Sequence, residues 1–193
     1  MIGAVILAAG QSRRMGRNKM LLPFGVSTVL ETIVTEVIAC EAVADVVVVT
    51  GHEPDRISAL LASYPARCVF NSAYARAEML VSLQVGLRAL AEEVQAALLV
   101  PGDHPRLRRD IIQRVIDAYQ PGALVIPSYR MKRGHPILID RVWWAELLAL
   151  PETATLRGFI RAHEDHIHYV VVDTDSVLKD VDTPEEYDDL LRA

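Results

Sequence analysis

The chain has 193 residues, of which 51% are hydrophobic and 23% are charged. This length and composition predict a single folded domain over residues 1–193, and they exclude a disordered chain. The formal net charge of −5 argues against a protein that binds nucleic acid, and no apolar stretch is long enough to span a membrane.

The cysteines and the first residues indicate a cellular compartment. Cys40 and Cys68 are too few for a disulfide framework and lack the spacing of metal ligands, which favours a reducing compartment. The apolar run at residues 1–9 lacks the basic segment that opens a signal peptide, and basic residues follow it instead. We therefore expect a cytoplasmic protein.

The first half of the chain alternates apolar runs with segments of helical periodicity. A strand is expected at Ile2–Ala8, because its apolar run is continuous, as in strands that are buried on both faces. A helix is expected after Thr28, which forms a capping box with Glu31. The next elements are a strand at Val46–Val49, a helix after Pro54 and a weaker strand at Arg67–Phe70.

The second half continues this alternation. Ser82 precedes a helical stretch. The elements expected after it are a strand at Ala96–Val100, a helix from Ile111 to Tyr119, strands at Ala123–Ile126 and Ile137–Ile139, a helix from Leu156 to Ile160 and a strand at Tyr169–Val172. A last helix begins at Thr183, with Pro184 in its first turn and Glu186 completing a second capping box.

This order of elements predicts a three-layer α/β/α fold of the Rossmann-like type, with a mostly parallel sheet between helices. The basic segment Ser128–Gly134 joins two strand-like runs without a helix between them, which predicts an antiparallel strand at the edge of the sheet. In such folds ligands bind at the carboxyl ends of the strands. The loops that follow the predicted strands are therefore the first place to look for a functional site.

The loop after the first predicted strand carries the strongest functional signal. It reads Leu7-Ala8-Ala9-Gly10-Gln11-Ser12-Arg13-Arg14-Met15-Gly16-Arg17-Asn18-Lys19. Its small residues let a base or a phosphate approach the backbone, and its cations can bind the same anion as the backbone N–H groups. Residues 1–30 hold four cationic side chains and no acidic one, so we expect a small anionic ligand here. The glycine spacing fits neither a P-loop nor the dinucleotide-binding fingerprint.

Two acidic residues lie next to other predicted elements. Asp103 comes after the strand Ala96–Val100 and a Pro-Gly turn, and Asp182 lies directly before the last helix. Carboxylates brought together at the ligand edge of the sheet can hold Mg²⁺. A turn role for Asp103 and a helix-entry role for Asp182 are the alternatives.

The loop from Leu7 to Lys19 resembles the L-A-A-G-x-S-x-R-M-G-x-x-K signature of the MobA-like nucleotidyltransferases at every fixed position. Later blocks resemble, in the same order, those of the molybdopterin cytidylyltransferase branch: Lys19–Phe24, Thr50-Gly51, Pro101–Pro105, Gly134–Pro136 and Asp180–Pro184. Guanylyltransferase relatives typically read L-A-G-G where this chain has Leu7–Gly10, so the resemblance favours cytosine as the base. The family usually has glycine at the position of Glu78.

This resemblance implies roles for individual residues. The nucleotide would be bound by Leu7, Ala8, Ala9, Gly10, Ser12, Arg14, Lys19, Thr50, Gly51, Ser82 and Gly102. Arg14, Lys19 and Asp103 would be the catalytic residues. Asp103 and Asp182 would hold Mg²⁺, with Asp180 as a reserve candidate.

A second basic loop offers a candidate site for the acceptor. We expect His135 and Arg133 there, because a terminal phosphate suits cationic and hydrogen-bonding side chains. Arg130 and Lys132 lie in the same loop. Arg157 is a further candidate, because its Leu-Arg-Gly element resembles a block of the same family. A solvated loop and a surface arginine are the alternatives for these residues.

The activity implied by the resemblance is transfer of CMP from CTP to the terminal phosphate of molybdopterin, with release of pyrophosphate and Mg²⁺ as cofactor. A phosphate acceptor is already anionic near neutral pH, which agrees with the lack of a nucleophile–base pair in the sequence. GTP or another NTP as donor, an isoprenoid or sugar phosphate as acceptor, and a non-catalytic carrier of the molybdenum cofactor are alternatives. An apo-hydroxylase of the xanthine dehydrogenase class would be the partner that receives the product.

Overall fold

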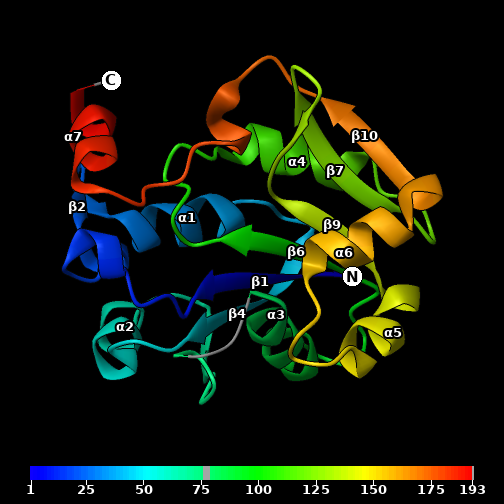
Figure 1. Ribbon diagram of the computed structural model, residues 1–193, viewed down its shortest axis with the longest axis horizontal. Coiled ribbons are helices and arrows are strands. Elements are labelled where there is room, and N and C mark those ends of the chain that lie inside the picture. Colours follow the sequence, from blue (N-terminus) through cyan, green and yellow to red (C-terminus); the bar gives the residue numbers. More distant parts are fainter. Residues whose placement is uncertain (76–78, 193) are drawn as a thin grey trace.

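The computed structural model describes residues 1–75 and 79–192, and it confirms the three-layer α/β/α fold (Figure 1). Its main sheet contains β1 (Ile2–Ala8), β4 (Val43–Thr50), β5 (Arg67–Phe70), β6 (Ala96–Pro101), β7 (Leu124–Tyr129), β8 (Lys132–Arg133), β9 (Ile137–Asp140) and β10 (Ile167–Val171). A separate small hairpin pairs β2 (Pro23–Phe24) with β3 (Ser27–Thr28). Glu78, where the sequence departs from the resembled family, lies outside the described residues.

Seven α-helices occur in the described part of the chain. They are α1 (Val29–Ile38), α2 (Pro54–Leu60), α3 (Met79–Ala89), α4 (Arg109–Asp117), α5 (Trp144–Ala149), α6 (Leu156–Ala162) and α7 (Pro184–Arg192). Both expected capping boxes are present, at Thr28 with Glu31 and at Thr183 with Glu186. The sequence predicted that Ser82 precedes a helix, but Ser82 lies within α3. No helix in this part of the chain is both long and apolar enough to cross a membrane.

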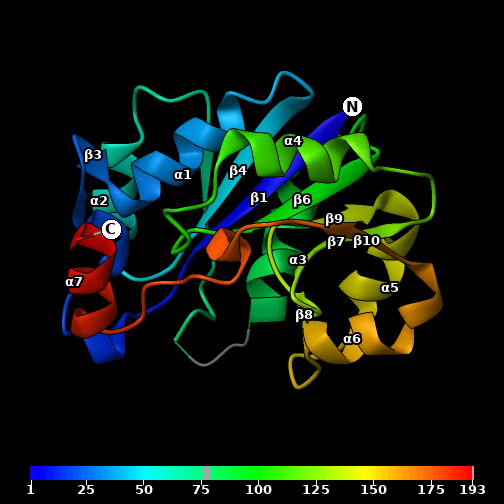
Figure 2. The same ribbon diagram turned by 90° about the horizontal axis from the view of Figure 1, so that it is seen from above.

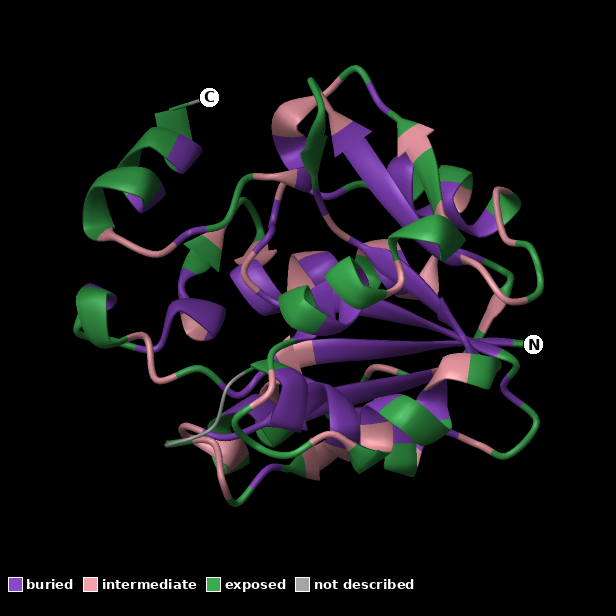
Figure 3. Cartoon of the chain, turned by 45° about the vertical axis from the view of Figure 1, so that its right-hand side comes forward, coloured by how far each residue is buried: buried purple, intermediate pink, exposed green. Residues whose placement is uncertain are grey.

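Helices cover both faces of the sheet, and successive side chains of a strand point to opposite faces. In β1, Ile6 belongs to the hydrophobic cluster that includes residues of α1, α2 and α4, whereas Val5 belongs to the cluster of α3, α5 and α6. Figure 2 shows α1 and α4 on one side of the sheet and α3, α5 and α6 on the other. Strands β1, β6, β7 and β9 are accordingly buried over most of their length, whereas β5, β8 and β10 contain no buried residue (Figure 3).

The order of the strands is β10-β7-β9-β6-β1-β4-β5, with β8 paired to β7. The sheet is mostly parallel, as expected, and residues 128–133 form the expected antiparallel excursion through the β7–β8 pair. The main antiparallel strand, β9, lies inside the sheet between β6 and β7, and not at its edge. After β6 the chain passes through α4 to β7, which does not pair with β6. Strand β9 comes later in the chain and lies between these two strands.

The last helix packs beside the loop that follows β1. Tyr187 and Leu190 of α7 form a cluster with Met15, Leu22 and Val29. The hydroxyl group of Tyr187 also donates a hydrogen bond to the carbonyl oxygen of Pro23 at 2.6 Å. The segment that precedes α7 is thereby held at the carboxyl edge of the sheet, next to the ends of β1 and β6.

Candidate active site

The loop after β1 folds back on itself through two short 3-10 turns. Ser12 and Gly16 flank the first turn with positive φ angles of 52° and 65°, so the chain reverses direction sharply at both ends of it. The hydroxyl oxygen of Ser12 accepts a hydrogen bond from the backbone N–H of Lys19 at 3.1 Å. The side chain of Asn18 caps the second turn by accepting from the backbone N–H of Met20. These contacts fix the position from which the Lys19 side chain projects.

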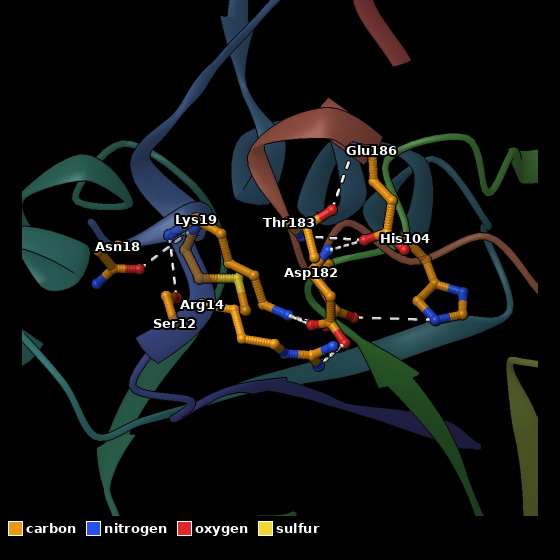
Figure 4. Close-up of polar contacts among 10 residues, drawn as sticks. Ser12, Arg14, Asn18, Lys19, His104, Asp182, Thr183 and Glu186 are labelled. Atoms are coloured by element: carbon orange, nitrogen blue, oxygen red, sulfur yellow. Dashed lines mark hydrogen bonds and ion pairs between the residues drawn. The ribbon is translucent and has the colours of Figure 1, made fainter. Parts of the chain in front are cut away.

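Lys19 joins the two acidic residues that the sequence predicted as metal ligands. Its ammonium group donates to Asp103 Oδ2 and to Asp182 Oδ1, each at 2.6 Å. Asp182 also forms an ion pair with Arg14 (Figure 4). The side chain of Lys19 is only 9% exposed, so these charge-assisted contacts form largely out of contact with water. The structure therefore brings the predicted catalytic and metal-binding residues Arg14, Lys19, Asp103 and Asp182 into one network.

The charges of this network shift the pKa values of its members. Burial lowers the pKa of Lys19, but the charges of Asp103 and Asp182 outweigh burial, and the pKa ends above its usual value. Burial raises the pKa of Asp182, but Lys19 and Arg14 together hold it below its usual range. Lys19 is therefore cationic and Asp182 anionic near neutral pH.

A third carboxylate completes an acidic cluster. Asp103, Asp180 and Asp182 each offer one oxygen, and these three oxygens lie within 4.8 Å of one another. Burial raises the pKa of Asp180, and the neighbouring charges of Asp103 and Asp182 raise it further. A hard divalent cation prefers carboxylate oxygens in such an arrangement and relieves their mutual repulsion. The three residues thus fit a divalent cation.

Hydrogen bonds to the backbone hold Asp103 and Asp182 in place. The backbone N–H of Val181 donates to the carbonyl oxygen of Asp103 at 3.0 Å, which ties the segment before α7 to the end of β6. The carboxylate of Glu186 accepts hydrogen bonds from the backbone N–H groups of Asp182 and Thr183 at 2.8 and 2.9 Å. The capping box of α7 therefore serves the site as well as the helix.

A cleft opens beside this network. Its inner part, of about 180 Å³, is lined by six of the residues predicted to bind nucleotide or metal: Leu7, Ala9, Gly10, Lys19, Ser82 and Asp103. Its outer part, of about 460 Å³, is lined by Gly10, Ser12, Arg14, Lys19 and Asp182 among others. Because Gly10 and Lys19 line both parts, we treat them as one continuous cleft. Lys19 and Asp103 therefore face a shared space.

Four residues predicted to bind nucleotide lie behind the cleft and not on its wall. Ala8 is fully buried in the core, and Thr50 is 1% exposed. A Cβ atom added to Gly51 would lie 2.5 Å from the carbonyl oxygen of Ala9, and one added to Gly102 would lie 2.8 Å from that of Leu7. These two glycines let neighbouring strand ends pack directly against the backbone of the loop.

The cleft also contains residues that sequence reasoning missed. Tyr74 and Met79 line both of its parts. Asn71, which is 2% exposed, donates from its side-chain amide to the hydroxyl oxygen of Ser82 at 3.0 Å. Asn71 directly follows β5, so the rule that ligands bind at the carboxyl ends of strands could have found it.

The three residues predicted to bind the acceptor line one pocket. Arg133, His135 and Arg157 surround a volume of about 490 Å³ that also contacts Met79. Because Met79 borders the cleft as well, the two spaces are neighbours. The basic side chains of the second loop point to two different pockets, because successive residues of strand β8 face opposite sides. Lys132 lines a different pocket together with Arg130.

His135 is neutral near neutral pH. Burial and the neighbouring imidazole of His104 lower its pKa to about 4, and the two ring centroids lie 5.6 Å apart. Burial also lowers the pKa of His104, whose Nε2 lies 3.8 Å from Asp103 Oδ1. The neutral His135 ring lines this pocket, and the positive charge there comes from the two arginines.

This chain is similar to known proteins over most of its length. The model of the MobA-like NTP transferase domain matches residues 4–167. Molybdenum cofactor cytidylyltransferase of Escherichia coli (strain K12) is 27% identical over 188 residues, which cover 96% of this chain and 93% of that protein. Nicotine blue oxidoreductase of Paenarthrobacter nicotinovorans is 27% identical over 194 residues, covering 96% of this chain and 94% of that protein.

Solved structures show the same fold over the whole chain. Rv0371c from Mycobacterium tuberculosis H37Rv has a TM-score of 0.86 and 26% identity, and the match covers 100% of this chain and 98% of that one. The crystal structure of Rv0371c in complex with manganese has a TM-score of 0.82 and 25% identity, with the same coverage of both chains.

Proposed function

The chain belongs to the MobA-like NTP transferase family, and we propose that within this family it transfers CMP from CTP to the terminal phosphate of a molybdopterin-type acceptor. The observation that carries the proposal is the arrangement of Lys19, Asp103 and Asp182 around one cleft beside the small residues of the loop after β1. The similarity to a molybdenum cofactor cytidylyltransferase over 96% of the chain supports the choice of donor and acceptor.

In the proposed reaction an oxygen of the acceptor phosphate attacks the α-phosphorus of CTP. A new P–O bond forms, the bond from the α-phosphorus to the bridging oxygen breaks, and pyrophosphate leaves with that oxygen. Because the acceptor phosphate is already anionic near neutral pH, the protein needs no general base to activate it. Its task is to position two anions and to offset their charge.

The chain's own residues can perform this task. Lys19 and Arg14 lie beside the cleft with charges that can bind the triphosphate, and Gly10 leaves room for it, since a Cβ atom there would meet nothing within 4 Å. Asp103 and Asp182, with Asp180 next to them, would hold Mg²⁺, which when bound supplies positive charge to the triphosphate oxygens. The manganese complex of Rv0371c supports a divalent cation in this family.

The acceptor would occupy the neighbouring pocket. Arg133 and Arg157 can bind its phosphate, and the neutral side chain of His135 would line the same pocket. Residues 1–193 would form one nucleotidyltransferase domain that works in the cytoplasm. It would then pass its product to an apo-hydroxylase of the xanthine dehydrogenase class.

A pyrophosphate-release assay tests the proposal. With molybdopterin as acceptor, we expect release from CTP and much less from GTP or ATP. Lys19→Ala and Asp103→Ala should each lower the rate by about 10²–10³, because each removes a preorganised charge. Lys179→Ala is the control: its side chain is 58% exposed and pairs with Asp175, so the rate should stay the same.

Three results would contradict parts of this account. Equal use of GTP would remove the cytidylyl assignment, and release with an isoprenoid or sugar phosphate but not with molybdopterin would change the acceptor. Binding of molybdopterin without any release of pyrophosphate would indicate a carrier of the cofactor.

A further inference from the structure

The ammonium group of Lys19 lies between two of the carboxylates that fit a divalent cation. Its Nζ atom is 2.6 Å from Asp103 Oδ2 and 2.6 Å from Asp182 Oδ1. In the acidic cluster, Asp103 and Asp182 each contribute one of the oxygens that lie within 4.8 Å of one another. One lysine side chain therefore contacts the same two groups that a bound cation would use.

A divalent cation and this ammonium group compete for the two carboxylates. A Mg²⁺ ion binds carboxylate oxygens at about 2.1 Å, so a lysine hydrogen-bonded to the same groups would be held close to it. The side chains of Lys19 and Asp103 are only 9% and 19% exposed, so water screens this repulsion weakly. Binding of a cation between Asp103 and Asp182 thus requires the ammonium group to move.

The ammonium group can meet a new partner in the cleft. Lys19 lines both parts of the cleft beside Gly10, and it is too buried to be released into bulk water at low cost. A triphosphate in the cleft would offer anionic oxygens to Lys19 and to Arg14, which is also bound to Asp182. The same ligand would supply further oxygens to the cation.

We infer that Lys19 excludes the divalent cation from the Asp103–Asp182 pair until a triphosphate draws its ammonium group away. The cation and the triphosphate then bind together, and the cation binds weakly alone. This inference rests on the proposed function, because it takes the ligand of the cleft to be a triphosphate. By linkage, the cation strengthens triphosphate binding by the same factor as the triphosphate strengthens cation binding.

Binding of Mn²⁺, followed by the electron paramagnetic resonance signal of the free ion, tests this inference without any turnover. In the absence of nucleotide, Lys19→Met should bind Mn²⁺ about tenfold or more tightly than the wild type, because the competing ammonium group is gone. Arg14→Met is the matched control. It removes one positive charge from the same network, but among the described residues Arg14 pairs with Asp182 and not with Asp103, so its effect should stay below about threefold.

A second measurement uses a non-hydrolysable CTP analogue at saturating concentration. The analogue should increase the affinity for Mn²⁺ by a larger factor in the wild type than in Lys19→Met, since only the wild type has an ammonium group to displace. Thermal melts of each variant check folding, and Lys19→Gln, with the same expectation, replaces Lys19→Met if that variant does not fold.

Two outcomes separate this inference from the proposed function. Equal Mn²⁺ affinities for Lys19→Met and Arg14→Met, together with pyrophosphate release by the wild type, would overturn the inference and leave the proposed function standing. If the wild type binds neither Mn²⁺ nor the analogue and releases no pyrophosphate, both are wrong.

Discussion

The surroundings of Asp180 disfavour the ionised form of its carboxyl group. Burial raises its pKa, and the charges of Asp103 and Asp182 raise it further. A carboxyl group with a raised pKa in the folded state destabilises the protein when it ionises. This cost is absent below its unfolded pKa of about 3.8 and appears as the pH rises through the folded pKa.

Replacement of Asp180 should therefore stabilise the protein in a pH-dependent way. We expect Asp180→Asn to raise the melting temperature by about 1–3 °C at neutral pH, since repulsion between partly exposed charges is worth up to about 1 kcal/mol. The difference should disappear as the pH falls below 4. Melting curves over this range in the presence of a chelator measure it. A variant that is less stable than the wild type at neutral pH would contradict the account.

At the residue scale, the sequence was most informative where charge and position in the chain agree. Asp103 and Asp182 could be predicted because each lies next to a recognisable element, and Lys19 because it ends the basic loop that resembles the family signature. Their mutual contacts could not, because they depend on three segments meeting in space. Tyr74 was missed for the same reason, since its place beside the cleft depends on the path of the loop after β5.

The element that most directly supports the site is α7. It begins two residues after Asp182 and packs through Leu190 against the cluster of Met15, Leu22 and Val29. The docking of this helix therefore determines where the carboxylate of Asp182 lies relative to Lys19.

Two neighbouring leucines of α7 form a matched test. Leu190→Ala should lower the free energy of unfolding by about 2–3 kcal/mol, because this side chain is 8% exposed within the cluster. It should also weaken Mn²⁺ binding in the presence of the CTP analogue. Leu191 is 52% exposed, so Leu191→Ala should change stability by less than about 0.5 kcal/mol. Urea unfolding and the Mn²⁺ titration measure both effects, and equal results for the two variants would contradict this role of α7.

At the element scale, strands were predicted better than helices. Buried parallel strands give continuous apolar runs, and every predicted strand is present within a few residues of its expected bounds. The start of α3 was missed because this helix is buried nearly all round, including Ser82, Gln84 and Gly86, and so lacks a clear polar face. A Cβ atom at Gly86 would lie 2.2 Å from Val5, which shows how closely this helix approaches β1.

At the scale of the whole molecule, the fold class followed from the alternation of elements, but the position of β9 did not. Strand order depends on contacts between distant segments. The sequence of residues 137–140 alone therefore does not predict that this strand lies between β6 and β7. The insertion matters for the site, because it sets the pocket of Arg133 and His135 beside the cleft of Lys19. Donor and acceptor can then occupy adjacent spaces at the same edge of the sheet.

The central claim is that a triphosphate and a divalent cation share the cleft between the loop after β1 and the three aspartates. A crystal structure with Mn²⁺ and the non-hydrolysable CTP analogue tests it most directly, because Mn²⁺ is located by its anomalous scattering. The account predicts Mn²⁺ on Asp103 and Asp182, triphosphate oxygens beside Gly10 and Arg14, and the Lys19 ammonium group moved onto the triphosphate. A triphosphate bound elsewhere, or Mn²⁺ away from these aspartates, would contradict it.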